Sequence, residues 1–170
     1  MRNGLLVALL LSLLGCVRVP AGLEVVEEFE VEPYLGRWYE IARLDHSFER
    51  GLTRVTADYS LRDDGSIRVV NRGFDQAAGR WKEVEGRARL AGRPGEGRLK
   101  VSFFGPFYGA YNILALDHRD YGYALISGPT RNYLWILARE PVLDPRRLAE
   151  LVDKARGWGF AVDRLIYVEH

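Results

Sequence analysis

The stretch TRVTADYSLRDDGSIRVVNRGF, residues 53–74, contains two alternating segments separated by a turn. In the first segment Val55, Ala57 and Tyr59 occupy every second position, which places them on one face of an extended strand. Residues 63–65 read Asp-Asp-Gly, a composition that favours a tight hairpin turn. The stretch therefore predicts a β-hairpin with one apolar face.

The same pattern continues on both sides of this hairpin, from residue 36 to residue 139. Turn residues divide the alternating segments, most clearly in the Gly- and Pro-rich loop at 92–97. Eight regularly spaced segments with hairpin-length connections predict an all-β fold, an eight-stranded antiparallel up-and-down barrel. The predicted strands are 36–44, 53–61, 66–74, 81–90, 99–104, 108–117, 121–127 and 132–139.

The periodicity changes near the C-terminus. Asp144 and Pro145 suit an N-cap followed by proline at the first helical position. The apolar residues that follow recur at i, i+3, i+4 and i+7, which predicts one amphipathic C-terminal helix; they are Leu148, Leu151, Val152 and Ala155. A short final strand is predicted over 165–168.

The composition excludes several classes of protein. A chain of 170 residues is long enough for one domain with a sizeable core. It carries 24 basic and 23 acidic residues, a balance that argues against a nucleic-acid partner. The chain has one cysteine, which excludes an intramolecular disulfide and a cysteine-cluster metal site. With three histidines far apart in sequence, we expect no metal site and no cofactor.

The N-terminus has the features of an export signal. Arg2 precedes an apolar run at 5–14, which at about 15 Å of helix is too short to cross a membrane. The run ends in Leu-Leu-Gly-Cys, which resembles the lipobox of bacterial lipoproteins and implies cleavage before Cys16 and lipid attachment to it. The predicted segments are a lipoprotein signal peptide at 1–15 and a lipidated N-terminal tether at 16–32. An ordinary signal peptide with a chance cysteine is the alternative.

The residue after the cysteine bears on location. Lipoproteins retained in the inner membrane often carry Asp there, whereas this chain has Val17. The resemblance therefore implies the outer membrane, with the domain facing the periplasm and held by acyl chains rather than by a basic surface.

Three clusters resemble the signature of the lipocalins. Gly36 and Trp38 stand as in the family's Gly-x-Trp motif on its first strand. Residues 120–121 are similar to the Thr-Asp-Tyr motif, although Arg119 replaces the threonine. Arg139 stands where the family has a single arginine on its eighth strand. The three clusters in this order, followed by one helix, identify residues 33–170 as a lipocalin domain by resemblance.

A closer resemblance extends over the whole domain. Residues 39–51 and 100–116 resemble the bacterial outer-membrane lipocalins, which are relatives of apolipoprotein D. This implies a protein that binds fatty acids or lysophospholipids for storage or transport in envelope maintenance. It also allows a homodimer. Some lipocalins are isomerases with a cavity thiol, but this chain has no cysteine after Cys16, so no enzymatic activity is expected.

In the family the first-strand tryptophan packs against the eighth-strand arginine at the closed end of the barrel. Trp38 and Arg139 are therefore assigned a structural role. If Arg139 points inward, so does Trp135, because strand side chains alternate. The same alternation places Glu40 inside, with Arg139 as its nearest candidate partner unless a bulge intervenes.

The candidate ligand contacts are inward-facing residues together with one hydroxyl near a strand end. Small inward residues leave room for an alkyl chain, whose burial would contribute ~0.8 kcal/mol per methylene. Tyr108 is the candidate for a head-group contact. By resemblance Tyr108 and Trp135 lead the predicted set, which also contains Tyr59, Val55, Val69, Ala88, Val101, Phe103 and Tyr133.

Two other functions stay open at this point. One is a structural envelope lipoprotein with an incidental cavity. The other is a binder of a different hydrophobic ligand such as haem, although no histidine occupies an inward barrel position. His46 is expected in a solvated loop and His118 in a turn.

Overall fold

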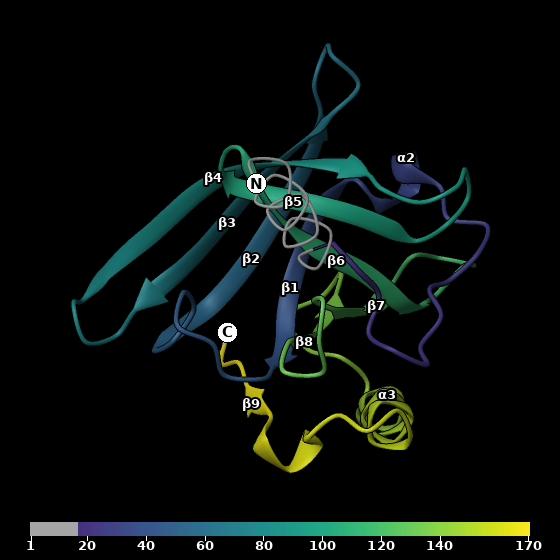
Figure 1. Cartoon of the computed structure of the whole chain (residues 1–170). Coiled ribbons are helices and arrows are strands. Elements are labelled where there is room, and N and C mark those ends of the chain that lie inside the picture. Colours follow the sequence, from purple (N-terminus) through teal and green to yellow (C-terminus); the bar gives the residue numbers. More distant parts are fainter. Residues whose placement is uncertain (1–16) are drawn as a thin grey trace, which may run out of the picture.

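The computed structural model describes residues 17–170 and shows a closed antiparallel barrel (Figure 1). Neighbouring strands pair in chain order from β2 to β8, then β8 pairs with β1, and β1 with β2, which closes the barrel. The predicted eight-stranded up-and-down barrel is confirmed. The strands are β1 (Gly36–Arg43), β2 (Leu52–Leu61), β3 (Ile67–Asp75), β4 (Arg80–Leu90), β5 (Arg98–Phe104), β6 (Phe107–Leu116), β7 (Tyr123–Ser127) and β8 (Leu134–Ala138).

The other elements lie outside the barrel wall. A one-turn helix, α2 (Val31–Tyr34), precedes β1 and is not apparent in the sequence pattern. The helix α3 (Pro145–Gly157) lies beside the barrel, followed by the 3-10 turn η1 (Val162–Arg164) and the short strand β9 (Ile166–Tyr167), which pairs with β1 (Figure 1). No helix within residues 17–170 is both long and apolar enough to cross a membrane.

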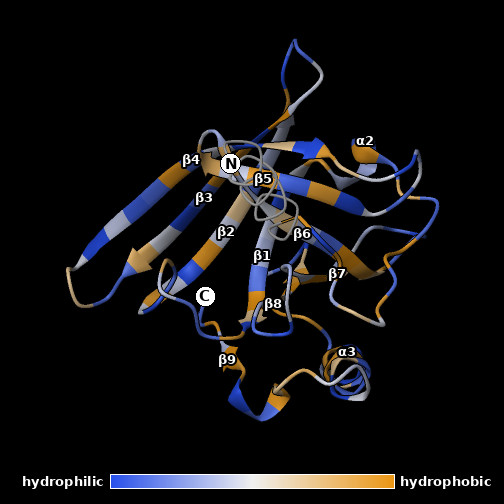
Figure 2. Cartoon of the chain, in the orientation of Figure 1, coloured by the Kyte–Doolittle hydropathy of each residue, from blue (hydrophilic) through white to orange (hydrophobic). Residues whose placement is uncertain are grey.

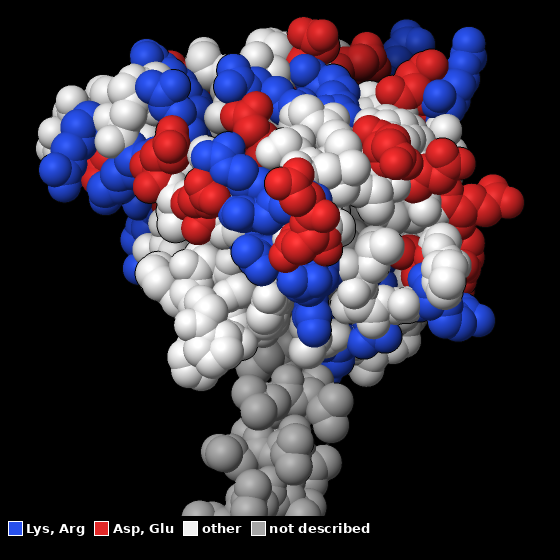
Figure 3. All heavy atoms as spheres, turned by 90° about the horizontal axis from the view of Figure 1, so that it is seen from above, with Lys and Arg blue, Asp and Glu red and all other residues white. Residues whose placement is uncertain are grey.

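The predicted hairpin of β2 and β3 forms, with Tyr59 opposite Val69. At its turn the carboxylate of Asp64 accepts a hydrogen bond from the amide of Ser66 at 3.0 Å and lies 3.2 Å from the guanidinium groups of both Arg87 and Arg89. Figure 3 shows acidic and basic side chains interspersed over the face seen from above. Positive and negative side chains are therefore intermixed on this face rather than gathered into separate patches.

The hydrogen bonds of Asp64 predict a specific pH dependence. Bonds from Ser66 lower the pKa of Asp64 from 3.8 to about 2. Stability from a depressed carboxyl pKa is present above the unfolded-state value and is lost as pH falls through the folded-state value. As the pH is lowered from about 4 to about 2, the urea midpoint of the wild type should therefore decrease. Asp64→Asn should reduce the size of that decrease. Asp63→Asn is the control, and equal curves for the two variants would contradict the assignment.

The apolar side chains divide into an inner and an outer core. The inner core fills the closed end of the barrel and includes Trp38 and Ile126. The outer core joins α3 to the outside of β8: Leu151 and Ala155 belong to one cluster with Leu134, Ile136 and Ala138. The strand β8 is therefore apolar on both faces, whereas hydrophobic and hydrophilic residues alternate along β2 and β3 (Figure 2). The Asp144 side chain caps α3, as predicted, by accepting bonds from two backbone amides.

Residues 17–32 differ from the predicted tether because they pack along the barrel. The backbone of Val26 bonds to Ile113 at 2.9 Å and to Gly97 at 2.7 Å, so the segment runs between β6 and the loop after β4. Phe29 is buried in the inner core. The predicted signal peptide at 1–15 and the predicted lipid site at Cys16 lie outside the described residues.

Candidate functional site

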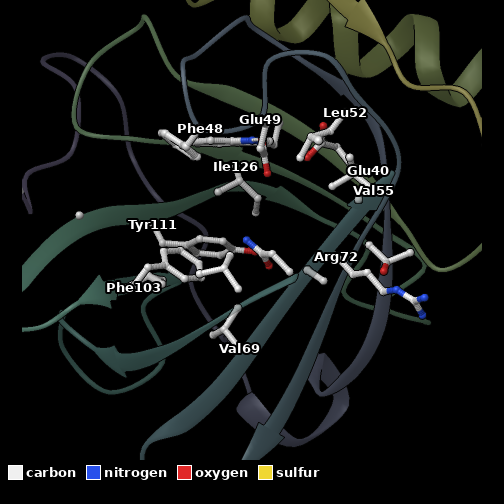
Figure 4. Close-up of a pocket in the computed structure, with 18 of the residues that line it drawn as sticks. Glu40, Phe48, Glu49, Leu52, Val55, Val69, Arg72, Phe103, Tyr111 and Ile126 are labelled. Atoms are coloured by element: carbon white, nitrogen blue, oxygen red, sulfur yellow. Dashed lines mark hydrogen bonds between the residues drawn. The ribbon is translucent and has the colours of Figure 1, made fainter. Parts of the chain in front are cut away.

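The barrel encloses a cavity of about 660 Å³ (Figure 4). Its wall is formed mainly by apolar residues of β2, β3, β5 and β6, and its rim by Phe48 of the β1–β2 connection with Phe104 and Phe107 of the β5–β6 hairpin. The opposite end of the barrel is plugged by Trp38. This size lies within the range of typical small-molecule sites.

Most of the predicted contacts meet in this cavity. Six of the nine line it: Val55, Tyr59, Val69, Val101, Phe103 and Trp135. Ala88 instead lies in the inner core with no exposed surface. Tyr133 stacks on Trp135, with ring centroids 6.3 Å apart, and is not part of the lining.

Tyr108 is also placed away from the cavity, contrary to the prediction. Its neighbours Phe107 and Gly109 line the cavity, so alternation along β6 directs Tyr108 to the other side of the strand. Its ring centroid lies 5.0 Å from the ammonium nitrogen of Lys100. Tyr108 is therefore not part of the cavity lining.

Tyr111, which was not among the predicted contacts, lines the cavity two residues beyond Gly109. Its hydroxyl lies 2.6 Å from the hydroxyl of Tyr34 and 3.0 Å from that of Tyr59, so three hydroxyls form a chain. Burial raises the pKa of all three, which keeps them neutral at physiological pH. The alternation along β6 could have identified Tyr111, but nothing local in the sequence indicates its two partners.

Removing the central hydroxyl of this chain should be more destabilising than removing a terminal one. Tyr111→Phe deletes two hydrogen bonds, and we expect the free energy of unfolding to fall by about 2 kcal/mol; Tyr59→Phe deletes one and should cost about 1 kcal/mol. Urea denaturation measures both. Equal losses for the two variants would contradict the central position of Tyr111.

A buried ion pair lies on one wall of the cavity. Glu40 lines the cavity, and its carboxylate accepts a hydrogen bond from the Arg43 guanidinium at 2.7 Å. The prediction that Arg139 is the partner of Glu40 is therefore wrong. A bulge between Glu40 and Ala42 changes the alternation of β1 and so brings the Arg43 side chain inside. Burial and the charge of Glu49 raise the pKa of Glu40, and Arg43 offsets this in part.

Glu49 lies in the segment between β1 and β2 and links that segment to β8. Its carboxylate accepts a hydrogen bond from the indole nitrogen of Trp135 at 3.0 Å and lies 2.7 Å from Nε2 of His46. Burial acts to raise the pKa of Glu49, but the interactions with His46 and Trp135 outweigh it and lower the value. His46 is buried and stacks on Phe48, so the prediction of a solvated histidine is wrong. These contacts hold the connection beside the cavity.

Trp38 and Arg139 meet at the closed end. Trp38 is fully buried, its indole nitrogen donates to the carbonyl of Tyr34 at 2.8 Å, and the Arg139 guanidinium carbon lies 4.0 Å from its ring centroid. Arg139 also donates to the carbonyls of Pro33, Arg37 and Tyr121. Gly36 has a φ of +93°, which favours glycine beside this arginine. This cluster joins α2, β1 and the end of β8.

Comparison with known proteins gives a consistent result. The family model described as a lipocalin-like domain matches residues 29–170. The chain is 50% identical to outer membrane lipoprotein Blc of Vibrio cholerae, over 91% of each chain, and 52% identical to outer membrane lipoprotein Blc of Escherichia coli, over 88% of this chain and 84% of the relative. Temperature-induced lipocalin-1 of Arabidopsis thaliana is 37% identical over 84% of this chain and 80% of the relative.

The solved structures extend this similarity at the level of fold. Insecticyanin from the tobacco hornworm Manduca sexta superimposes with a TM-score of 0.72 at 21% identity, covering 90% of this chain and 87% of that one.

Proposed function

Because the chain belongs to the lipocalin family, we propose that it is a carrier that binds a small hydrophobic ligand in its barrel cavity, with long-chain fatty acids or lysophospholipids as the ligand class. The observation that carries this proposal is the cavity of about 660 Å³ with its largely apolar wall. Among the described residues no cluster suited to hold a metal ion is found, and the carboxylates of Glu40 and Glu49 on the cavity wall accept hydrogen bonds from Arg43 and Trp135.

The relatives support a location for this carrier. The proteins that match at 50% identity and above are named outer membrane lipoproteins. The same location here requires lipid on Cys16, with the barrel on the periplasmic side of the outer membrane. Binding of membrane-derived amphiphiles at that place would serve storage or transport in envelope maintenance.

The shape of the cavity predicts which part of the ligand provides the affinity. The apolar wall runs from the aromatic rim down to Val69 and Tyr111, and Figure 4 shows both side chains facing the interior. Each methylene buried there contributes ~0.8 kcal/mol before the cost of immobilising the chain. The affinity should therefore rise with chain length, and the carboxylates of Glu40 and Glu49 should influence the choice of head group.

The test is a titration of the delipidated protein with homologous ligands. Fatty acids and lysophospholipids of eight to eighteen carbons, kept below their micellar concentrations, are compared by isothermal calorimetry. We expect one site per barrel and an affinity that increases with each added pair of carbons for both head groups. Absence of binding for every long-chain member would contradict the proposal.

A further inference from the structure

Three phenylalanine side chains form an exposed aromatic rim at the mouth of the cavity. Phe104 is 78% exposed, Phe107 70% and Phe48 64%, although each also contributes to the lining. When several large apolar side chains are this exposed at one site on a surface, they indicate that the site contacts another apolar surface, such as a membrane or a second protein. Phe104 and Phe107 occupy the tip of the β5–β6 hairpin.

The first described residues are fixed to the same hairpin. The carbonyl of Val17 accepts a hydrogen bond from Arg98 at 3.0 Å, and the carbonyl of Arg18 accepts one from the side-chain amide of Asn112 at 3.1 Å. Arg98 and Asn112 are paired across β5 and β6. Six residues separate Arg98 from Phe104, which is roughly 20 Å along a strand. A lipid on the residue before Val17 would therefore leave the protein beside this hairpin, at the end away from Phe104.

The charge of the hairpin suits an anionic lipid surface. Residues 98–112 contain Arg98 and Lys100 and no acidic residue, in a chain whose overall charge is nearly balanced. Basic side chains next to a membrane are attracted to anionic head groups, and aromatic rings bury readily at the boundary between head groups and acyl chains. The hairpin thus combines both properties along one edge of the barrel.

We propose that the β5–β6 hairpin lies lengthwise on the bilayer that holds the N-terminal lipid, so that Phe104 and Phe107 of the aromatic rim insert at the interface and the mouth of the cavity opens at the membrane surface. This inference rests on the proposed function in one respect, the lipid on Cys16. It adds a second membrane contact, about 20 Å from the first. A hydrophobic ligand would then pass between the bilayer and the cavity without crossing water.

The experiment places a single label at the rim and at a matched control position. Phe104→Cys and Val142→Cys suit this purpose because both native side chains are 78% exposed, and Val142 follows β8 at the closed end. The one native thiol is Cys16, which lipid would block, so a nitroxide attaches to the introduced cysteine. The lipidated proteins are placed in vesicles of phosphatidylethanolamine and phosphatidylglycerol. Spin relaxation by oxygen and by a water-soluble nickel complex then reports depth.

In vesicles the label at 104 should gain oxygen accessibility and lose nickel accessibility, each several-fold relative to the detergent-solubilised protein, while the label at 142 should not change. Equal nickel accessibility at both positions in vesicles would overturn the proposal. Shielding of position 104 to the same degree without vesicles would assign the rim to a second copy of the chain and overturn it too. So would the absence of acylation at Cys16 in mass spectra of the intact protein.

Ligand binding measured on the same vesicles separates the two proposals. If the label at 104 inserts but no long-chain ligand binds, the docking stands and the proposed function fails. If long-chain ligands bind and the label stays in water, the proposed function stands and the docking fails.

Discussion

Replacing Trp38 with alanine is expected to lower the free energy of unfolding by about 3–5 kcal/mol, the range seen when a large aromatic side chain is deleted from a core. Three losses contribute. The fully buried ring leaves a cavity at the closed end, the Arg139 guanidinium loses the π face that it covers at 4.0 Å, and the carbonyl of Tyr34 loses its indole donor. Urea denaturation at neutral pH measures the change.

The matched control for this prediction is Trp81→Ala. Trp81 is 44% exposed on β4 and also contacts an arginine, Arg72, at 4.3 Å from its ring centroid. Because surface substitutions have small effects, this change should cost about 1 kcal/mol or less. A similar loss for both variants would show that the position at the closed end has no special structural role.

Replacing Val101 with tryptophan is expected to shorten the ligand that the cavity accepts. Val101 lies on the cavity wall and is only partly buried, so a larger side chain there extends into the cavity rather than into the packed core. The indole should displace roughly three methylene-sized groups of a bound chain, ~0.8 kcal/mol each. A sixteen-carbon ligand should therefore lose about 2.4 kcal/mol, roughly 50-fold in affinity. A ten-carbon ligand should lose much less.

The control is Val142→Trp, which adds the same ring outside the cavity at an exposed position. It should leave the dependence of affinity on chain length unchanged, and thermal unfolding should show that both variants are folded. If Val101→Trp weakened short and long ligands by the same factor, the ligand chain would lie elsewhere than along this wall.

The regular parts of this fold follow from local patterns in the sequence. Strand alternation with one face buried specified the eight barrel strands, and the spacing of Leu151 and Ala155 specified the face of α3. The segment over 17–32 has no such periodicity. Its attachment depends on backbone hydrogen bonds to β6, which side-chain patterns do not encode.

The residues of the candidate site were likewise predictable only where they follow a local sequence pattern. Alternation placed Val55, Val69 and Val101 on the cavity wall, whereas Tyr108, which was assigned by resemblance, lies outside the lining. The bulge in β1 could not be read from the sequence, so the partner of Glu40 was missed. Glu49 belongs to an irregular connection, and its bond to Trp135 spans 86 residues of the chain. Contacts of that kind arise only when the barrel closes.

The most direct test of the central claim is the identity of what the protein carries. The lipidated protein is purified from cells without added ligand, extracted with organic solvent and examined by mass spectrometry, with Val101→Trp prepared in parallel. We expect a long-chain fatty acid or lysophospholipid in up to equimolar amount from the wild type, and shorter chains or less ligand from the variant. Extracts that contain the same lipids in the same proportions for both proteins, or none from either, would contradict binding in this cavity.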